Sequence, residues 1–445
     1  MRTEIDRKTI ETFQKDFASS DKNRIAMNAV VKNGINESCN VMKSDIVNTY
    51  NFSISLEAGK IKNQNTSGRC WMFAALNVMR LEVMERFNLE DMELSQAYPF
   101  FWDKLEKSNY FLENILETLE EPLEGRVLNF LLSDPLCDGG QWDMFVNLVR
   151  KYGVIPKEAM PESRSSSHPK EMNFLLTAKL RNFACELRSA NERGESSEQM
   201  RIFKEQMLNE IYRMLCISLG EPPEHFTYEV RDKDDKFIRI EDITPQEFYE
   251  RYVGMDLDEY VSIINAPTAD KPYERTFTVQ YLGNIKGNRP VRYLNLRSSE
   301  LKRVAIEQMK DGEVVWFGSD VSHFTNRVSG ILALDAFDFD GLFSTGFPMD
   351  KAQRLDFGQS CMNHAMVLTG VNLDGEGNPN RWKIENSWGE EKGNKGFFVM
   401  SDDWFDQFTY QVVVQKRYLT DEQLAALERE PIVLKPWDPM GSLAL

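Results

Sequence analysis

The sequence predicts an α+β fold in which helices come first and a β-sheet follows. Two observations in the 445-residue chain support this prediction. Apolar residues after Cys70 and after Ser196 recur every three or four positions, the spacing of a helix with one buried face. Beyond Pro290 the chain becomes short runs of β-branched and aromatic residues, separated by Gly, Asn and Asp. Because these runs do not alternate with helices, an antiparallel sheet is expected.

Capping signals and periodicity place the predicted helices. Ser196 is followed three residues later by Gln199, and Thr244 is followed by Pro245 and Glu247, so both positions are typical helix starts. The predicted helices lie near residues 9–18, from Cys70 onward, at 142–151, after Ser196, after Thr244, at 301–309 and at 420–430. We therefore expect residues from about 160 to 285 to be mostly helical.

The β-rich half is predicted strand by strand from its composition. The predicted strands are 291–296, 313–321, 364–371, 381–386, 396–400 and 411–418. Asp374-Gly375 lies between two of them and predicts a hairpin turn. The last fifteen residues contain three prolines and many apolar residues, so we expect an extended tail that docks on the rest of the protein.

Composition and charge exclude several functional classes. A formal net charge of −17 argues against a mainly nucleic-acid-binding role. No run approaches the roughly 18 apolar residues of a membrane span, and the first residues contain no apolar signal region. The six cysteines form no close pairs, so a reducing cytoplasm is expected. No His-Glu-x-x-His, Cys-x-x-Cys or Gly-rich phosphate loop occurs, and we expect neither a metal nor another cofactor.

Cys70 is the strongest candidate for a nucleophile. It follows the turn Ser67-Gly68-Arg69 and begins a predicted helix, whose N-terminus favours a thiolate. Gln64 lies six residues upstream and can direct an amide N–H at the atom that the thiolate attacks. These are two parts of an acyl-transfer site, which also needs a base and a group that orients the base.

His364 and Asn386 supply the missing parts. His364 heads an apolar strand, where a polar side chain is costly unless it has a partner. Asn386 ends the next strand and can accept the imidazole N–H, and Trp388 can cover that hydrogen bond. The other three histidines, at 168, 225 and 323, lie in loops or at a strand end and are interpreted as structural or exposed.

The order Gln64, Cys70-Trp71, His364 and Asn386-Ser387-Trp388-Gly389 resembles the papain-like cysteine proteases. The resemblance implies that Cys70 is the nucleophile, His364 the base and then acid, and Asn386 the orienting residue. It also implies that Gln64 and the Cys70 N–H form an oxyanion hole and that Trp388 shields the His–Asn bond. The fold it implies has a helical lobe and an antiparallel β lobe.

Asp138-Gly139-Gly140 resembles the Gly-Gly of that family, whose backbone lines the substrate cleft, so Gly139 and Gly140 are candidate substrate-binding residues. The chain departs from the usual papain-like pattern in two ways, and both limit the resemblance to part of that family. Ser67 stands where the usual signature has a cysteine, and Cys70 and His364 are about twice as far apart as the roughly 130–150 residues of papain-type enzymes. A large helical insertion between the lobes is therefore expected.

These departures and the closing run Pro436-Trp437-Asp438-Pro439-Met440-Gly441 are similar to the branch that contains bleomycin hydrolase and bacterial aminopeptidase C. The resemblance implies a homohexamer with inward-facing sites. It also implies a C-terminal arm in the cleft, whose terminal carboxylate, here on Leu445, holds the substrate's α-amine. The expected segments are an N-terminal arm (1–60), a helical catalytic lobe (61–160), a mostly helical insertion (161–285), a β-rich catalytic lobe (286–430) and the C-terminal arm (431–445).

The predicted function is that of a cytosolic cysteine aminopeptidase that releases N-terminal residues from peptides through a thioester. Its expected partners are peptide substrates and further copies of itself, with no membrane and no nucleic acid. Two alternatives stay open at this point. One is a papain-like endopeptidase, and the other is an oligomeric scaffold with a vestigial site.

Overall fold

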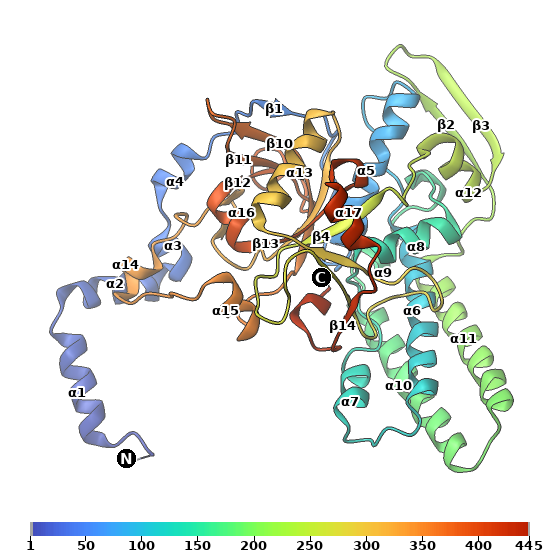
Figure 1. The fold of residues 1–445 in the computed structure, drawn as a ribbon, viewed down its shortest axis with the longest axis horizontal. Coiled ribbons are helices and arrows are strands. Elements are labelled where there is room, and N and C mark those ends of the chain that lie inside the picture. The colour runs from blue at the N-terminus through green and yellow to red at the C-terminus, as the bar shows by residue number, and fades with distance from the viewer. Residues whose placement is uncertain (1–2, 444–445) are drawn as a thin grey trace.

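The computed structural model describes residues 3–443, which form a central mixed sheet with helices packed on both faces (Figure 1). Eleven strands follow the order β14-β5-β6-β4-β13-β7-β10-β11-β12-β9-β8, and β1 pairs with β10 beside this path. Most neighbours are antiparallel, as expected, but β4–β6, β5–β14 and β9–β12 are parallel.

The strands of this sheet are β1 (Ile54–Ser55), β4 (Tyr260–Ile264), β5 (Arg275–Val279), β6 (Tyr293–Asn295), β7 (Val315–Ser319), β8 (Thr325–Asn326), β9 (Ile331–Leu332), β10 (His364–Leu373), β11 (Pro379–Glu385), β12 (Phe397–Ser401), β13 (Thr409–Gln415) and β14 (Ile432–Leu434). The predicted turn at Asp374 closes the β10–β11 hairpin. Strand alternation divides the core in two. Trp316 and Val367 face the helical lobe, and Phe317 and Leu368 face the opposite side.

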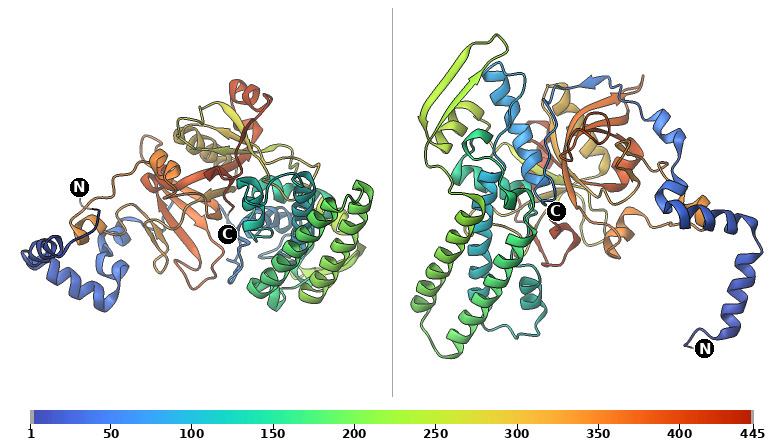
Figure 2. Two further views of the ribbon diagram at one scale, coloured as in Figure 1. Left: turned by 90° about the horizontal axis from the view of Figure 1, so that it is seen from below. Right: turned by 180° about the vertical axis from the view of Figure 1, so that it is seen from behind.

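The helical lobe lies against the first of these faces. Its helices are α5 (Cys70–Arg86), α6 (Ala97–Glu117), α7 (Arg126–Ser133), α8 (Trp142–Tyr152), α9 (Arg164–Ser167), α10 (Lys170–Glu192) and α11 (Ser197–Leu219), with a 3₁₀ turn at Lys157–Ala159. α5 contacts β7 and β10, and α6, α10 and α11 pack side by side (Figures 1 and 2). The helix predicted from Cys70 is present, but the single buried stripe is wrong, because residues 70–80 are buried on all sides between the sheet and neighbouring helices. The Gly220 N–H caps the end of α11.

The opposite face of the sheet is covered by α13 (Ser298–Lys310) and α16 (Asp402–Phe408). The shorter elements near this lobe are α14 (Phe339–Phe343), α15 (Lys351–Asp356), α17 (Asp421–Leu427) and the 3₁₀ turns Lys416–Tyr418 and Pro439–Gly441. The expected helix 420–430 is present as α17, and Thr420 forms its capping box.

The expectation that 160–285 is mostly helical is wrong beyond Leu219. The chain there forms a hairpin of β2 (Phe226–Arg231) and β3 (Phe237–Ile243), then α12 (Pro245–Phe248), a π-helical turn (Tyr249–Val253), β4 and β5. In β2, Phe226 and Tyr228 are buried while Thr227 and Glu229 are exposed. This alternation is typical of a strand.

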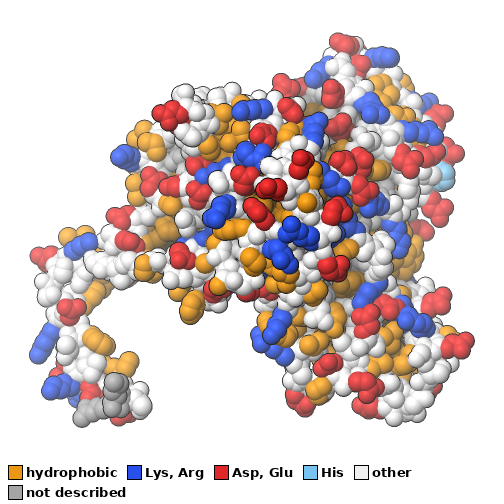
Figure 3. Space-filling model, in the orientation of Figure 1, with side chains coloured by type: hydrophobic (Ala, Val, Ile, Leu, Met, Phe, Trp, Pro, Cys, Tyr) orange, Lys and Arg blue, Asp and Glu red, His pale blue; other side chains and the backbone are white. Residues whose placement is uncertain are grey.

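The N-terminal segment extends away from the body (Figure 1). It consists of α1 (Arg7–Ala18), α2 (Asp21–Asn33), α3 (Ile35–Cys39) and α4 (Met42–Val47), and α1 and α2 bury no residue. Several large apolar side chains on these helices are exposed, including Phe13, Ile25 and Val31. Acidic and basic side chains are interspersed over the face shown in Figure 3. No helix within residues 3–443 is long and apolar enough to cross a membrane.

Candidate active site

Cys70 is the first residue of α5 and is fully buried. The turn before it is held by Arg69, whose guanidinium makes two hydrogen bonds to Glu162 at 2.9 and 2.8 Å. Ser67 accepts from the Arg69 Nε at 2.9 Å and donates to the Gln64 carbonyl at 2.7 Å. A serine hydroxyl therefore braces this turn at the position where the resembling family has a cysteine.

His364 is the first residue of β10, and its imidazole bonds to the predicted partner. The His364 Nε2 lies 2.8 Å from the Asn386 Oδ1, directly beyond the end of β11. Asn386 is buried, and its Oδ1 also accepts the Ser387 N–H at 2.8 Å. The Trp388 ring lies 4.8 Å from the imidazole, centroid to centroid, and the Arg327 guanidinium lies 4.9 Å from the centroid of that indole. The indole is therefore placed to cover the hydrogen bond.

The helical and β lobes meet at the sulfur. The Ala365 N–H, next to His364, donates to the Cys70 Sγ at 3.4 Å. The Gln64 amide is buried on the same seam. Its Oε1 accepts from the Ser387 Oγ at 2.5 Å, and its Nε2 donates to the Ser67 carbonyl at 2.6 Å. One of the two amide hydrogens on Nε2 is thus engaged, and the second is the candidate oxyanion donor.

Burial opposes each charge of the Cys70–His364 pair taken alone. Burial raises the pKa of the Cys70 thiol to about 12, although the Ala365 N–H acts in the other direction. Burial also lowers the pKa of His364 to about 4, although the hydrogen bond that its imidazole donates to the Asn386 Oδ1 acts to raise it. From the sequence, the helix N-terminus is expected to lower the pKa of Cys70 and favour a thiolate. In the structure, desolvation in the closed site raises that pKa instead.

The Asp138-Gly139-Gly140 run lies beside Trp71, the residue after Cys70. The Asp138 carbonyl accepts from the Trp71 Nε1 at 2.8 Å, and a Cβ on Gly140 would lie 2.5 Å from the Trp71 ring. Asp138 forms a 2.6 Å ion pair with Lys104, which contributes to lowering its pKa to about 2 against the effect of burial. The backbone of this run therefore lies against α5, the helix that begins with Cys70.

The C-terminal arm enters the same region. β14 pairs with β5, Met440 is buried, and Ser442 makes hydrogen bonds to both lobes. The Ser442 Oγ donates to the Met362 carbonyl at 2.8 Å, two residues before His364, and the Gln141 Nε2 donates to the Ser442 carbonyl at 2.8 Å, directly after Gly140. Leu445 lies outside the described residues.

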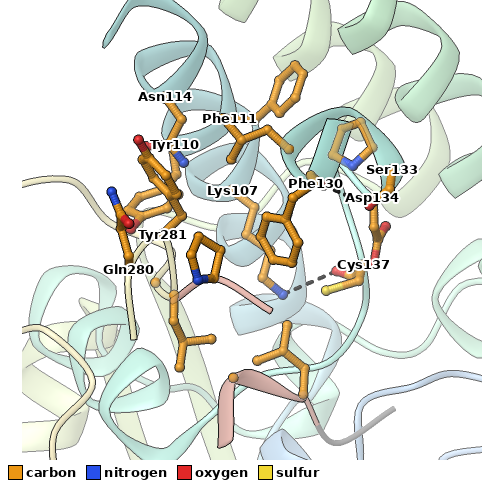
Figure 4. A pocket seen from close by; sticks show the side chains of 17 residues that line it. Lys107, Tyr110, Phe111, Asn114, Phe130, Ser133, Asp134, Cys137, Gln280 and Tyr281 are labelled. Carbon is orange, nitrogen blue, oxygen red and sulfur yellow. Dashed lines mark hydrogen bonds between the residues drawn. The ribbon is translucent and has the colours of Figure 1, made fainter. Parts of the chain in front are cut away.

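Leu443 lines a cavity of about 270 Å³ beside the arm. Phe130 and Tyr281 lie on opposite sides of this cavity (Figure 4). The Lys107 ammonium donates to the Cys137 carbonyl at 3.1 Å and to the Gly139 carbonyl at 2.6 Å. The arm therefore packs on the same backbone that carries the predicted Gly-Gly.

The remaining histidines lie outside this cluster of site residues. His168 bonds to Thr66 and is half-buried at the edge of the turn, His225 contacts Asp242, and His323 stacks on Phe408. Among residues 3–443, no group of His, Cys, Asp and Glu side chains could hold a metal ion. Sequence reasoning missed Ser387 as the partner of Gln64, although it lies inside the Asn-Ser-Trp-Gly motif. It also missed Arg69 and Glu162, whose pairing has no local sequence signal.

The fold and this buried thiol, imidazole and carboxamide define a cysteine-type peptidase of the papain-like class. The chain belongs to the peptidase C1-like family, whose model matches residues 4–441. It is 51% identical to aminopeptidase C of Streptococcus thermophilus over 96% of both chains, and 43% identical to bleomycin hydrolase of Gallus gallus over 90% of both. A crystal structure of PepW from Lactobacillus rhamnosis superposes with a TM-score of 0.98 at 50% identity, covering all of both chains.

These comparisons confirm three predictions. The α+β papain-like fold is confirmed, as is the branch that contains aminopeptidase C and bleomycin hydrolase. The predicted class of enzyme, a cysteine-type aminopeptidase that acts on peptides, is also confirmed.

Proposed function

We propose that this aminopeptidase cleaves the first peptide bond of its substrate with Cys70 as nucleophile, in a cleft that its own C-terminal arm closes on one side. The observation that carries the proposal is Ser442. Its carbonyl accepts from the side-chain amide of Gln141, next to Gly140, and its hydroxyl donates to the Met362 carbonyl, two residues before His364. An arm at this position leaves room for only a short stretch of substrate before the scissile bond. Gly139 and Gly140 line the cleft, and the terminal carboxylate of Leu445 pairs with the substrate's α-ammonium group.

The proposed reaction is acyl transfer. His364 takes the thiol proton, and the Cys70 sulfur attacks the carbonyl carbon and forms a C–S bond. The Gln64 side chain and the Cys70 N–H donate to the oxyanion. The C–N bond then breaks as His364 protonates the leaving amine. Water attacks the thioester carbonyl carbon while His364 takes a proton from it, the C–S bond breaks, and the released thiolate regains that proton from His364.

Two positioning roles complete the proposal. Asn386 fixes the imidazole tautomer through its 2.8 Å bond, and Trp388 excludes water from that bond. Desolvation disfavours a thiolate or an imidazolium alone. The proton therefore passes directly between the sulfur and the imidazole, so that the two charges form and disappear together. We also propose a helical lobe (61–160) that carries the nucleophile and a β-rich lobe (286–430) that carries His364 and Asn386, with arms at 1–60 and 431–445. The insertion between the lobes (161–285) is mostly helical only up to Leu219.

The proposed location is the cytoplasm, and the proposed assembly is a homohexamer. All six cysteines are free, which fits a reducing compartment. The exposed apolar side chains of α1 and α2 support self-association through the N-terminal arm. Native mass spectrometry should show a species of six times the 51.6 kDa chain. A monomer at micromolar concentration would refute the hexamer and leave the catalytic proposal intact.

The decisive experiment compares free and N-acetylated peptides with the intact protein and with a protein that lacks residues 442–445. The intact protein should cleave only the free peptide. The truncated protein should cleave both at similar rates and should gain internal cleavage. Ser442→Ala, which removes one anchor, should lie between them, and Ser197→Ala, an exposed serine at the start of α11, is the matched control.

Two results would reject the proposal. An unchanged preference for free peptides after truncation would show that the arm does not recognise the substrate's α-amine. Full activity in Cys70→Ala would remove the nucleophile. Rapid labelling of Cys70 by a thiol-reactive epoxide is expected, and its absence would favour the vestigial scaffold.

A further inference from the structure

Arg80 forms a buried junction outside the catalytic set. It lies in α5, ten residues after Cys70, and its side chain is 1% exposed. Its Nη2 lies 2.6 Å from the Glu385 Oε1, and that carboxylate is also 1% exposed. The same guanidinium donates to the Ala58 carbonyl and, at 2.9 Å, to the Lys60 carbonyl. One planar side chain thus joins a helix, a strand and the segment that precedes the turn.

Each of these three elements carries one candidate group of the active site. α5 begins with Cys70, and Glu385 is the residue directly before Asn386. The two carbonyls bound by Arg80 lie four and six residues before Gln64. The nucleophile, the orienting carboxamide and the oxyanion donor therefore share one buried anchor.

Backbone bonds make the coupling between two of these elements tight. The Gln64 N–H donates to the Ser387 carbonyl at 2.9 Å, and the Gly389 N–H donates to the Lys62 carbonyl at 3.3 Å. The Lys62 ammonium pairs with Asp91 at 2.8 Å. A shift of the Gln64 segment would therefore move the Asn386 turn with it.

The energetics argue against a purely stabilising role for the pair. Burial raises the pKa of Glu385 to about 7, although Arg80 and Lys62 both act to lower it. Desolvation of the carboxylate thus outweighs the attraction of its partners. Buried ion pairs of this kind are often replaced by apolar residues without loss of stability. Arginine, unlike an apolar residue, offers several donors in a fixed plane and can hold three segments in one register.

We propose that Arg80 and Glu385 are positioning residues that hold the Cys70 helix, the Gln64 segment and the Asn386 strand in catalytic register. This inference rests on the proposed roles of those three residues. A displacement of about 1 Å at a reacting group can cost about 10²-fold in rate, so a loose register lowers kcat while substrate binding is retained.

The test uses full-length enzyme and compares Glu385→Gln, Arg80→Lys and the double variant Arg80→Met/Glu385→Leu. Active-site titration gives kcat and KM per functional thiol, and thermal unfolding gives the midpoint. Both single variants should lose about 10- to 100-fold in kcat with KM within about twofold. The double variant removes both charges, so it should recover the thermal midpoint while kcat stays low.

A control pair lies on the other face of the sheet. Lys302 bonds to Asp402 at 2.7 Å, and both side chains are partly buried. Lys302→Met should lower the midpoint and leave kcat within about twofold. A second readout is the pH dependence of Cys70 alkylation by iodoacetamide, which should change in Glu385→Gln and stay unchanged in the control.

The proposal is overturned if the double variant recovers kcat together with its midpoint, or if the single variants lower only the midpoint. If a single variant fails to fold, the kcat and thermal midpoint of the double variant decide the test. The proposed catalytic roles are tested separately, because Cys70→Ala in the parent enzyme removes the nucleophile and leaves Arg80 and Glu385 unchanged.

Discussion

Gly140→Ala tests whether the Gly-Gly backbone is fixed by the nucleophile helix as well as by the substrate. Its φ lies outside the left-handed region, so alanine meets no backbone strain there. A Cβ would instead lie 2.5 to 2.6 Å from three atoms of the Trp71 ring. The substitution therefore adds one methyl group against the residue that follows Cys70.

The magnitude follows from the contact. Carbon atoms pack at about 3.5 Å, so the ring or the Gly140 backbone must move by about 1 Å. Trp71 cannot move freely, because its Nε1 donates to the Asp138 carbonyl at 2.8 Å and its carbonyl accepts from the Trp316 Nε1 at 3.2 Å. Overpacking of this kind costs about 1–3 kcal/mol in stability. A 1 Å shift at the adjoining Cys70 predicts a loss of about 10²-fold in kcat.

The assay is kcat per titrated thiol together with the thermal midpoint. Gly375→Ala is the matched control, because a Cβ there meets no atom within 4 Å. We expect that control to behave as wild type in both measurements. If Gly140→Ala also kept wild-type kcat and midpoint, the Trp71 contact would not constrain the site, and the argument would be refuted.

Two further predictions concern buried polar groups. Burial lowers the pKa of Lys351 to about 7 from 10.5, so between these values the unfolded chain holds a proton that the folded chain has lost. Stability should therefore rise with pH in that window by about 1.4 kcal/mol per unit. In Lys351→Met this slope should be absent, and parallel thermal-unfolding curves against pH in the two proteins would contradict the assignment. Ser387→Ala removes the hydroxyl that fixes the Gln64 Oε1, so titrated kcat should fall about 2- to 10-fold. An unchanged kcat would show that the amide is held without it.

The site could be predicted largely because its groups lie in short contiguous motifs. Gln64 and Cys70 lie on one turn, and Asn386 and Trp388 lie at one strand end. The local chemistry of such motifs is readable without knowledge of the fold. The choice of His364 among the four histidines rests on a similar local signal, since a polar residue at the head of an apolar run indicates a partner.

The parts that sequence reasoning missed depend on contacts between distant segments. Arg80 and Glu385 are more than 300 residues apart, and neither has a local pattern that names its partner. The β2–β3 hairpin was missed for a different reason. Its alternation is short and polar on one side, and the strong helical pattern after Ser196, which is α11, dominated the interpretation.

The pH dependence of catalysis connects the Cys70–His364 pair to the arm. Moving a proton from the thiol to the imidazole leaves the pair's net charge unchanged. The ratio of the thiol–imidazole form to the thiolate–imidazolium form therefore does not vary with pH. Burial moves the isolated pKa values outward, to about 12 for Cys70 and about 4 for His364. Neither residue of the pair therefore gains or loses a proton to solvent in the neutral range. A change of rate with pH in that range (a limb of the pH–rate profile) must come from another group.

On the enzyme, Glu385 is one such group, because burial raises its pKa to about 7. With a free peptide, the substrate's own α-amine is a second, with a pKa of about 8. If the arm's carboxylate binds the ammonium form, kcat/KM should fall above about pH 8, tenfold for each further pH unit, as the ammonium group loses its proton. The protein lacking residues 442–445, acting on an N-acetylated peptide, should show no limb at this position. The measurement is kcat/KM from pH 6 to 10 for both pairs of enzyme and substrate. A limb near pH 8 that persists with the acetylated peptide would assign the titration to the enzyme and reject recognition of the α-ammonium group by the arm.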